Sequence, residues 1–588
     1  MKTASLPRIL VDLFPGRDRW LLIGVITIGM ISAFFETLGV ASILPFMTFV
    51  LDPAAIERYP LFSAISRSVG ATSNREALVL LGIATAAVVT IGNIAAATNV
   101  LVQERFTART LSRLSSSLFE GYLKQPYAFH VQRDAPSLMK IVLTDVRVVM
   151  SACVSPVFAA VSRIFMALGI LGILCAQDPF VAVSVVLILG ATYATVFRVV
   201  RARQRRLGAE MNAQNLDRQR IVQEGLGGAK ELQMLGRERY VAERFETATI
   251  GVARAEASNR LNASLPRYAL ETVSFVGILL VTVVLLASGD RSAQSLVPVL
   301  ALYAFAGYRL LPALQQIFSS AMTIRFYQSV LRGMHKDFLA VTSLPTGFAG
   351  ELQTQAPDLH FADTIQLQKV GFSYAGGAAP SLRDVNLVIR PKESIGLVGR
   401  TGAGKTTLAD IILGLYEPSA GAVTVDGVSL KGPAMRAWRR RVGYVPQQVF
   451  LANASVTENI AFALPRSEID EDAVLRAARL AQADEFVRAL PDGFDTLVGE
   501  RGVKLSGGQR QRIGIARALY HEPEVLVFDE ATSALDGLTE DAVMEAIRSL
   551  SGQRTIILVA HRLRTVEACD RIVLMEEGRI LADGPYQE

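Results

Sequence analysis

The stretch Gly399-Arg-Thr-Gly-Ala-Gly404-Lys405-Thr406 fits the pattern G-x-x-x-x-G-K-[ST], whose glycines let consecutive backbone N–H groups turn toward a phosphate. The apolar residues 394–398 before it read as a strand, and residues 407–413 after it read as a helix. A helix N-terminus favours anions, so the segment predicts a nucleotide-binding α/β domain rather than a plain glycine-rich turn. The residues predicted to hold the phosphates are Gly399, Arg400, Thr401, Gly402, Ala403, Gly404, Lys405, Thr406 and Thr407.

Two acidic residues follow a second apolar strand signal, Val525-Leu-Val-Phe528. The carboxyl end of a strand is where α/β sheets bind ligands. We therefore expect Asp529, with the Thr406 hydroxyl, to hold the Mg²⁺ that accompanies ATP. Glu530 is predicted to be the base that orients the attacking water. An acidic strand end that only caps the next helix is the alternative.

With the phosphate loop followed by the acidic strand end, residues 365–586 resemble the ATPase domain of an ABC transporter. The resemblance implies that Tyr374 stacks on adenine and that Gln447 senses Mg²⁺. It also implies that His561, which ends a further apolar strand, contacts the γ-phosphate. A lone histidine is otherwise usually structural. The positions that the resemblance implicates are Tyr374, Gln447, Ser506, Gly507, Gly508, Gln509, Asp536 and His561.

The same resemblance implies a dimer. The segment Leu505-Ser-Gly-Gly-Gln509 matches the signature that contacts the γ-phosphate bound to the opposite subunit. One ATPase domain per chain implies a half-transporter, so a second identical chain is expected to complete each ATP site. Residues 496–502 match a loop that is characteristic of exporters rather than importers.

The N-terminal half is too apolar for a soluble enzyme. The 588 residues are 51% hydrophobic, the mean hydropathy is +0.34, and the apolar residues gather before residue 330. Six stretches are long enough to cross a bilayer. We therefore predict an α-helical membrane domain of the ABC exporter type over 1–340, a linker over 341–363 and an α/β ATPase domain over 364–588. The predicted spans are about 21–50, 77–101, 150–175, 180–200, 267–287 and 295–322.

Basic residues predict the orientation. The segment 201–265 carries 12 Lys and Arg and 102–148 carries seven, against three in 51–76. Both termini are therefore expected on the cytoplasmic side of a bacterial inner membrane. A pI near 9.2 could suggest nucleic-acid binding, but the positive-inside rule already accounts for the excess. Segments 124–131 and 223–232 stand where such exporters carry coupling helices; ordinary helix–turn–helix linkers are the alternative.

Ionisable residues within the predicted spans suggest a substrate. Counted at about 1.5 Å per helical residue, Arg163 and Arg309 lie roughly 20 Å from the outer ends of their spans. Arg267 falls near the inner headgroups. Such residues tend to face a cavity or a partner, and arginine binds phosphate bidentately. A lipid phosphate is one interpretation. Snorkelling of Arg267, or neutralisation of an arginine by Glu36, is the other.

Three membrane stretches, residues 35–46, 265–271 and 308–312, resemble the PglK-type flippases of lipid-linked oligosaccharides. The resemblance implies that a lipid-linked oligosaccharide or related phospho-glycolipid moves from the inner to the outer leaflet. Those flippases carry a basic residue in mid-span two, where this chain has Gly92-Asn93. Another lipid, an amphipathic drug or a peptide is the alternative cargo, and six spans argue against a non-transport ABC ATPase.

Overall fold

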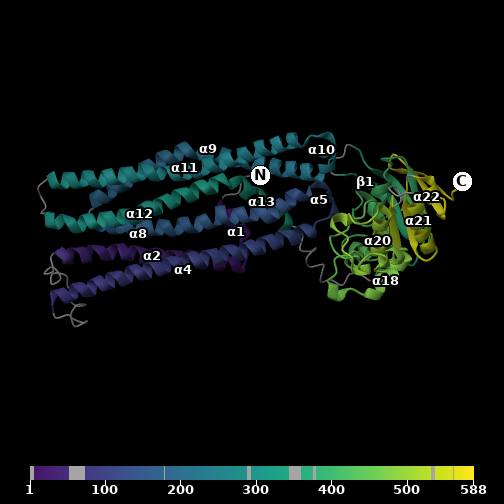
Figure 1. The fold of residues 1–588 in the computed structure, drawn as a ribbon, viewed down its shortest axis with the longest axis horizontal. Helices are drawn as coiled ribbons and strands as arrows, with labels where there is room; N and C mark the ends of the chain where they lie inside the picture. Colours follow the sequence, from purple (N-terminus) through teal and green to yellow (C-terminus); the bar gives the residue numbers. More distant parts are fainter. Residues whose placement is uncertain are drawn as a thin grey trace. The chain divides into compact units, whose positions relative to one another are not determined.

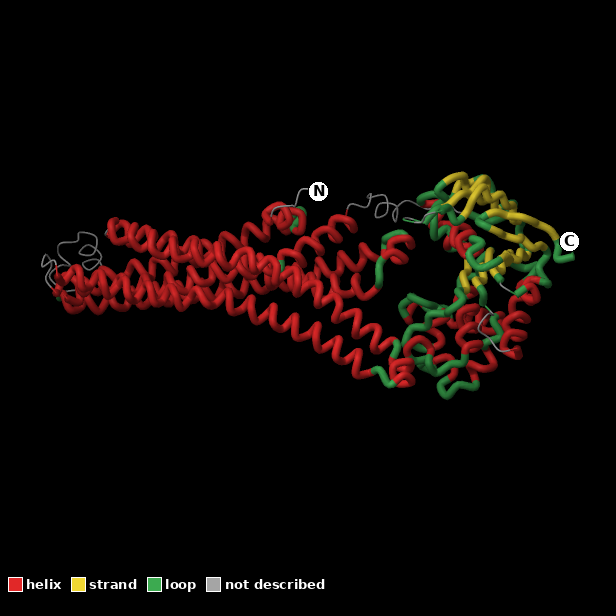
Figure 2. The backbone as a smooth tube through the Cα atoms, turned by 90° about the horizontal axis from the view of Figure 1, so that it is seen from above, coloured by secondary structure: helices red, strands yellow, loops and turns green. Residues whose placement is uncertain are grey.

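The computed structural model describes residues 6–51, 73–177, 179–287, 293–342, 359–374, 376, 379–531, 537–560 and 562–587. The chain divides into two compact units. We call them the helical unit, Met1–Gln125 with Arg133–Ser343, and the α/β unit, Pro126–Gln132 with Leu344–Glu588. Among the residues that the structure describes, helices make up the first unit and every strand lies in the second (Figures 1 and 2).

Long helices form the helical unit, and each predicted span lies within one continuous helical stretch. Apolar residues fill these helices, and Pro45 and Pro266 are accommodated within α2 and α11. The run from Ala135 to Gln177 is helical throughout and includes two π-helical turns, Ile141–Asp145 and Met150–Val154. The helices are α1 (Leu6–Leu13), α2 (Arg17–Leu51), α4 (Asn74–Leu123), α6 (Ala135–Lys140), α7 (Val146–Val149), α8 (Ser155–Gln177), α9 (Pro179–Gly227), α10 (Ala229–Leu235), α11 (Glu238–Ala287), α12 (Ala293–Phe326) and α13 (Gln328–Thr342).

By length and hydropathy, three helices within the described residues could cross a membrane: Arg17–Leu51, Arg75–Leu123 and Ala135–Gln177. Within the unit, α2 packs along α4 and α8, and α9 packs along α11 (Figure 1). Val40, Ile170, Leu302 and Ala313, from α2, α8 and α12, form one buried apolar cluster. This packing brings residues far apart in the sequence to the same level of the bundle.

Two sheets organise the α/β unit. The antiparallel sheet has the order β2-β1-β4-β5, and the second has the order β10-β9-β3-β8-β7-β6. In the second sheet β9, β3, β8, β7 and β6 are parallel, so their carboxyl ends share one edge. The strands are β1 (Ile365–Phe372), β2 (Leu382–Ile389), β3 (Ser394–Gly399), β4 (Ala420–Val425), β5 (Val428–Ser429), β6 (Val442–Val445), β7 (Val525–Asp529), β8 (Thr555–Val559), β9 (Arg571–Glu576) and β10 (Arg579–Gly584).

Helices surround these sheets and complete two buried cores. Trp438 is fully buried, and its indole N–H donates to the Ile412 carbonyl over 2.6 Å. The strands predicted before the phosphate loop and before Asp529 are confirmed as β3 and β7. The helices are α5 (Tyr127–Gln132), α15 (Lys405–Ile412), α16 (Pro433–Arg439), α17 (Val456–Ile460), α18 (Glu471–Leu480), α19 (Asp484–Arg488), α20 (Gly507–Leu519), α21 (Gly537–Leu550) and α22 (Leu563–Val566).

The predicted linker over 341–363 overlaps the end of α13 at its first two residues. Residues 343–358 of it lie outside the described residues. The two predicted coupling segments fall in different units. The first overlaps α5, which belongs to the α/β unit, and the second overlaps α10, which belongs to the helical unit.

Candidate functional site: a phosphate loop and a membrane charge cluster

The phosphate loop connects β3 to α15 with backbone angles that only glycine adopts without strain. Gly404, at the N-cap of α15, has φ +97°. A Cβ there would lie 2.7 Å from the Ser381 carbonyl oxygen. A Cβ on Gly399 would lie 2.2 Å from the Met575 carbonyl oxygen. The loop therefore needs these two glycines to keep its shape.

Lys405 is buried beneath this loop, with 5% of its surface exposed. Its Nζ donates to the carbonyl oxygens of Gly399, at 2.8 Å, and Arg400, at 3.2 Å. Burial lowers the pKa of Lys405, while the negative charges of Glu530 and Asp529 act in the opposite direction. The lysine and the two acids thus share one electrostatic neighbourhood at the sheet edge.

The predicted base and the predicted Mg²⁺ sensor are in direct contact. Gln447 donates from Nε2 to Glu530 Oε2 over 2.8 Å. Asp529 ends β7, and the backbone N–H of Glu530 donates to the Val559 carbonyl of β8. Glu530 has φ +49°, an uncommon backbone conformation for a non-glycine residue. Such conformations cluster at functional sites because surrounding structure must hold them in place.

The predicted adenine-stacking residue contacts the phosphate-loop helix. The Tyr374 hydroxyl lies 3.0 Å from the Thr407 hydroxyl. The Tyr374 ring also packs edge-on against Phe372, with centroids 5.0 Å apart, and against Tyr416, at 5.6 Å. These contacts fix the place of the ring at one end of the loop.

The signature residues form the start of a helix. Ser506 is the N-cap of α20, where its hydroxyl accepts from the Gln509 N–H and the Gln509 side chain accepts from the Ser506 N–H. This capping box leaves the helix N-terminus beginning with Gly507 and Gly508, a setting that favours an anion. Asp536 and His561 lie outside the described residues, so their roles stay predictions.

The residues present fit ATP and Mg²⁺. The cradle is formed by the backbone of the loop, whose path at Gly404 leaves no room for a Cβ beside the Ser381 carbonyl. Among the described residues there is no group of three or more His, Cys, Asp and Glu suited to a metal. Oxygen ligands from Thr406, Gln447 and Asp529, with the nucleotide phosphates, match the preference of Mg²⁺.

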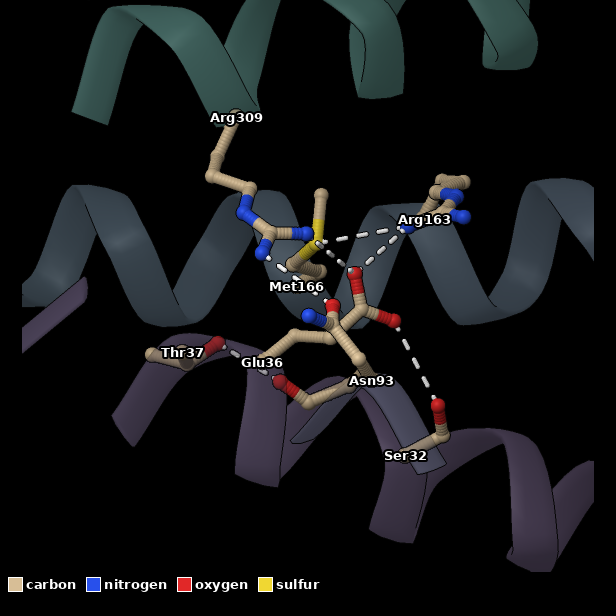
Figure 3. A network of polar contacts seen from close by, with 8 residues as sticks. Ser32, Glu36, Thr37, Asn93, Arg163, Met166 and Arg309 are labelled. Atoms are coloured by element: carbon tan, nitrogen blue, oxygen red, sulfur yellow. Dashed lines mark hydrogen bonds and ion pairs between the residues drawn. The ribbon is translucent and has the colours of Figure 1, made fainter. Parts of the chain in front are cut away.

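A second polar site lies within the helical unit, and we call Glu36, Asn93, Arg163 and Arg309 the Glu36 cluster (Figure 3). Arg163 of α8 donates to Glu36 Oε2 of α2 over 2.8 Å, and Arg309 of α12 lies 3.7 Å from the same oxygen. Arg309 also donates to Asn93 of α4 over 3.4 Å. The structure therefore brings two of the three predicted substrate arginines together. Glu36 pairs with both of them.

Charge within the Glu36 cluster is unbalanced, because two guanidinium groups share one carboxylate. The Glu36 side chain is 6% exposed, Arg309 24% and Arg163 37%. Among the described residues, the buried Nε of Arg309 has no hydrogen-bond acceptor. The cluster therefore carries a net positive charge and an unused donor.

Arg267, the third predicted substrate residue, does not join this cluster. Its Nε donates to Glu271 Oε1 over 2.6 Å, one turn along α11, and its side chain is 55% exposed. The pair neutralises itself locally. Arg267 and Glu271 are four residues apart, a spacing from which an ion pair along one helix could have been predicted.

Two residues near the predicted ATP site, Asp410 and Tyr416, were not predicted from the sequence. Burial and the charge of Asp529 raise the pKa of Asp410, in α15, to about 6. Tyr416 is buried in the apolar core with Phe372. Neither belongs to a motif, and their positions follow only from the packing of α15 against the sheets. The α5 residue Tyr127 also reaches Tyr416, with ring centroids 5.6 Å apart.

Comparisons with known proteins agree with both halves of the structure. The family described as "ABC transporter" matches residues 382–533, and the "ABC transporter transmembrane region" matches residues 29–309. An "ATP-dependent lipid A-core flippase" of Alkalilimnicola ehrlichii is 34% identical over 489 residues, which are 82% of this chain and 80% of that protein. A flippase of the same name from Shewanella denitrificans is 28% identical over 96% of this chain and 92% of its own length.

A solved structure of a bacterial Atm1-family ABC exporter with ATP bound superposes on this chain with a TM-score of 0.73. It covers 97% of this chain and 95% of its own, at 23% sequence identity. At that identity the likeness concerns the fold: a helical membrane domain followed by an ATPase domain.

Proposed function

Because this chain belongs to the ABC transporter family, with its membrane and ATPase domains on one polypeptide, we propose that it moves a phosphate-bearing glycolipid from the inner to the outer leaflet of a bacterial inner membrane. The chain binds ATP and couples its hydrolysis to transport. The substrate class is supported by the Glu36 cluster and by relatives that are named as lipid flippases.

The single observation that carries the substrate proposal is the unbalanced charge of the Glu36 cluster. A cation held among membrane helices is costly unless something compensates it. Glu36 compensates one of the two arginines, and Arg309 keeps an unused Nε donor. A phosphate group would supply both the missing charge and the missing acceptor, because arginine binds phosphate through paired N–H groups.

Roles within the ATP site follow the geometry described above. Lys405 would leave its loop carbonyls to reach the phosphates. Thr406, Gln447 and Asp529 would hold Mg²⁺, which neutralises charge on the phosphates. Glu530 would orient the water, and its contact with Gln447 keeps it in place.

The working unit is proposed to be a homodimer of chains with six spans each and both termini in the cytoplasm. The capped N-terminus of α20 then faces the γ-phosphate held by the partner chain. Closure of the two ATPase domains around ATP, and their reopening after hydrolysis, would drive the alternation of the membrane domain between inward and outward access.

A second candidate function is export of an amphipathic drug or another lipid. It is favoured by a cavity of about 420 Å³ between α8, α9 and α12, which lies within the size range of small-molecule sites. The described residues that line it are almost wholly apolar and none is charged: Leu171, Gly190, Tyr193, Ala194, Phe197, Leu310, Leu314, Ile317, Phe318 and Ala321.

Translocation in proteoliposomes separates these candidates. A lipid-linked oligosaccharide, its dephosphorylated form and a hydrophobic drug would be compared for ATP-dependent movement and ATPase stimulation. Arg309→Gln and Arg163→Gln should slow the phosphorylated lipid and leave the drug unchanged. Arg267→Gln is the matched control, since Arg267 is paired with Glu271. Equal movement of the phosphorylated and dephosphorylated lipids would refute the phosphate role.

A further inference from the structure

Four aromatic rings run from α5 to the predicted adenine-stacking residue. Tyr127 of α5 packs against Tyr416 with centroids 5.6 Å apart, and Tyr416 packs against Tyr374 at the same distance. Phe372 contacts both Tyr416 and Tyr374, each at 5.0 Å. We call these residues the aromatic chain. Three of the four contacts are edge-on or nearly so, an arrangement that aromatic pairs favour.

The two middle rings of the aromatic chain are buried and its two end rings are exposed. Tyr416 and Phe372 are both 7% exposed and belong to one buried core, whereas Tyr127 is 44% exposed and Tyr374 37% exposed. Burial raises the pKa of Tyr416 to about 12, so its hydroxyl stays neutral. A close-packed ring between two exposed rings transmits displacement, because a packed core yields little.

Each end of the aromatic chain has a further anchor. Tyr374 is tied to α15 through the 3.0 Å contact with the Thr407 hydroxyl. At the other end, Ala128 of α5 packs against the same core as Tyr416. Short connections join α5 to α4 and α6, which are helices of the helical unit. A shift of α5 and a shift of the Tyr374 ring are therefore mechanically linked.

We propose that Tyr416 is a positioning residue, which holds the Tyr374 ring against the adenine base and couples base binding to the position of α5 through Tyr127. The proposal rests on the adenine role of Tyr374 in the proposed function. It adds a coupling between the nucleotide and α5 that depends on the adenine base and not on the phosphates. Binding of the base favours one position of α5, and by linkage that position favours binding of the base.

Comparison of ATP with inorganic tripolyphosphate isolates this base-dependent coupling, because tripolyphosphate carries three linked phosphates without a base. The full chain in nanodiscs would be titrated with MgATP and with Mg-tripolyphosphate. Tyr416→Leu should weaken ATP binding about threefold to tenfold, the size of one or two aromatic contacts, and leave tripolyphosphate binding unchanged. Tyr416→Phe keeps the ring and should restore ATP affinity. Phe361→Leu is the matched control, since Phe361 is buried in the same core but packs on Trp438.

Hydrogen exchange over Tyr127–Gln132 tests the coupling to α5. ATP should protect this segment more than tripolyphosphate does, and Tyr416→Leu or Tyr127→Leu should remove the difference. If Tyr416→Leu weakens ATP and tripolyphosphate equally, the residue is only structural and the proposal is wrong. If Tyr374→Ala itself leaves ATP affinity unchanged, the adenine assignment in the proposed function fails instead. Unaltered α5 protection in Tyr416→Leu would refute the coupling alone.

Discussion

The phosphate loop and the Glu36 cluster both hold cations close to carboxylates, yet they are built from very different lengths of sequence. The loop is continuous from Gly399 to Thr407, and its shape depends on backbone geometry at glycine. The Glu36 cluster takes one side chain from each of α2, α4, α8 and α12. The shape of the phosphate loop is set by main-chain groups. The properties of the Glu36 cluster are set by the balance between its charged side chains.

This difference determines how each site should respond to substitution. In the phosphate loop, backbone N–H groups are the proposed phosphate donors, and a side-chain substitution does not remove them. In the Glu36 cluster, every change alters the balance between two guanidinium groups and one carboxylate. Loss of one partner of a buried ion pair leaves an uncompensated charge, which is the costly outcome.

The largest effect should come from Glu530→Gln. ATP hydrolysis is expected to fall roughly 100-fold or more, the contribution of a positioned general base, while MgATP binding persists. Hydrolysis and nucleotide binding would be measured on the same reconstituted sample. Glu522→Gln, an exposed acid of the same unit, should behave as wild type. Hydrolysis by Glu530→Gln at the wild-type rate would remove Glu530 from its role.

Completion of the site by a second chain gives the next effect. Lys405→Ala and Ser506→Ala should each prevent formation of the ATP-bound closed state. Mixed chains should regain it in part, because one composite site in each heterodimer is intact. Closure would be followed by crosslinking or by distance measurements between labelled ATPase domains. Failure of every mixture to recover would contradict the trans arrangement.

Motifs explain why the ATP site could be predicted from sequence and the membrane site only in outline. The strand, loop and helix around Lys405 are contiguous, so local pattern alone predicted β3 and α15. The pairing of Glu36 with both Arg163 and Arg309 depends on how four helices pack. Depth along a helix could be counted, but rotation about its axis could not. Arg267 sat at a suitable depth and nevertheless pairs with its own helix neighbour.

The same reasoning explains the residues that the sequence missed. Tyr416 follows α15 and carries no motif, and its contact with Tyr374 exists only because β1 and α15 share a core. Asn93 stands where the oligosaccharide flippases carry a basic residue. In the structure it accepts a hydrogen bond from Arg309, a role that a basic residue could not fill. The resemblance to those flippases remains a prediction.

A double-mutant cycle at the Glu36 cluster should show the next largest effect. Glu36→Gln should lower the unfolding temperature of the helical unit, because two arginines lose their shared counter-charge. Arg163→Gln combined with Glu36→Gln should cost less than the two single changes added, with a coupling of roughly 0.5–3 kcal/mol. Thermal unfolding in nanodiscs measures both. Strictly additive effects would mean that the 2.8 Å contact contributes nothing.

The smallest expected effect is on the pH dependence of stability and concerns Asp410. Unlike Glu36, Asp410 forms no ion pair with another described residue. Its pKa is raised to about 6, chiefly by burial and then by Asp529. The folded state therefore holds this proton more tightly than the unfolded state does. Stability from this group is present below about pH 4 and is lost as the pH rises through about 6.

Asp410→Asn mimics the protonated side chain at every pH. The variant should unfold at a higher temperature than wild type already at pH 5, and its advantage should grow to a few degrees by pH 7.5, where Asp410 of folded wild type is ionised. The comparison is made without nucleotide, so that the phosphates do not mask the effect of Asp529. If the advantage of the variant does not grow between pH 5 and pH 7.5, Asp410 stays hydrated, and ionising this unpaired acid carries no cost of the kind that the ion pairs of Glu36 offset.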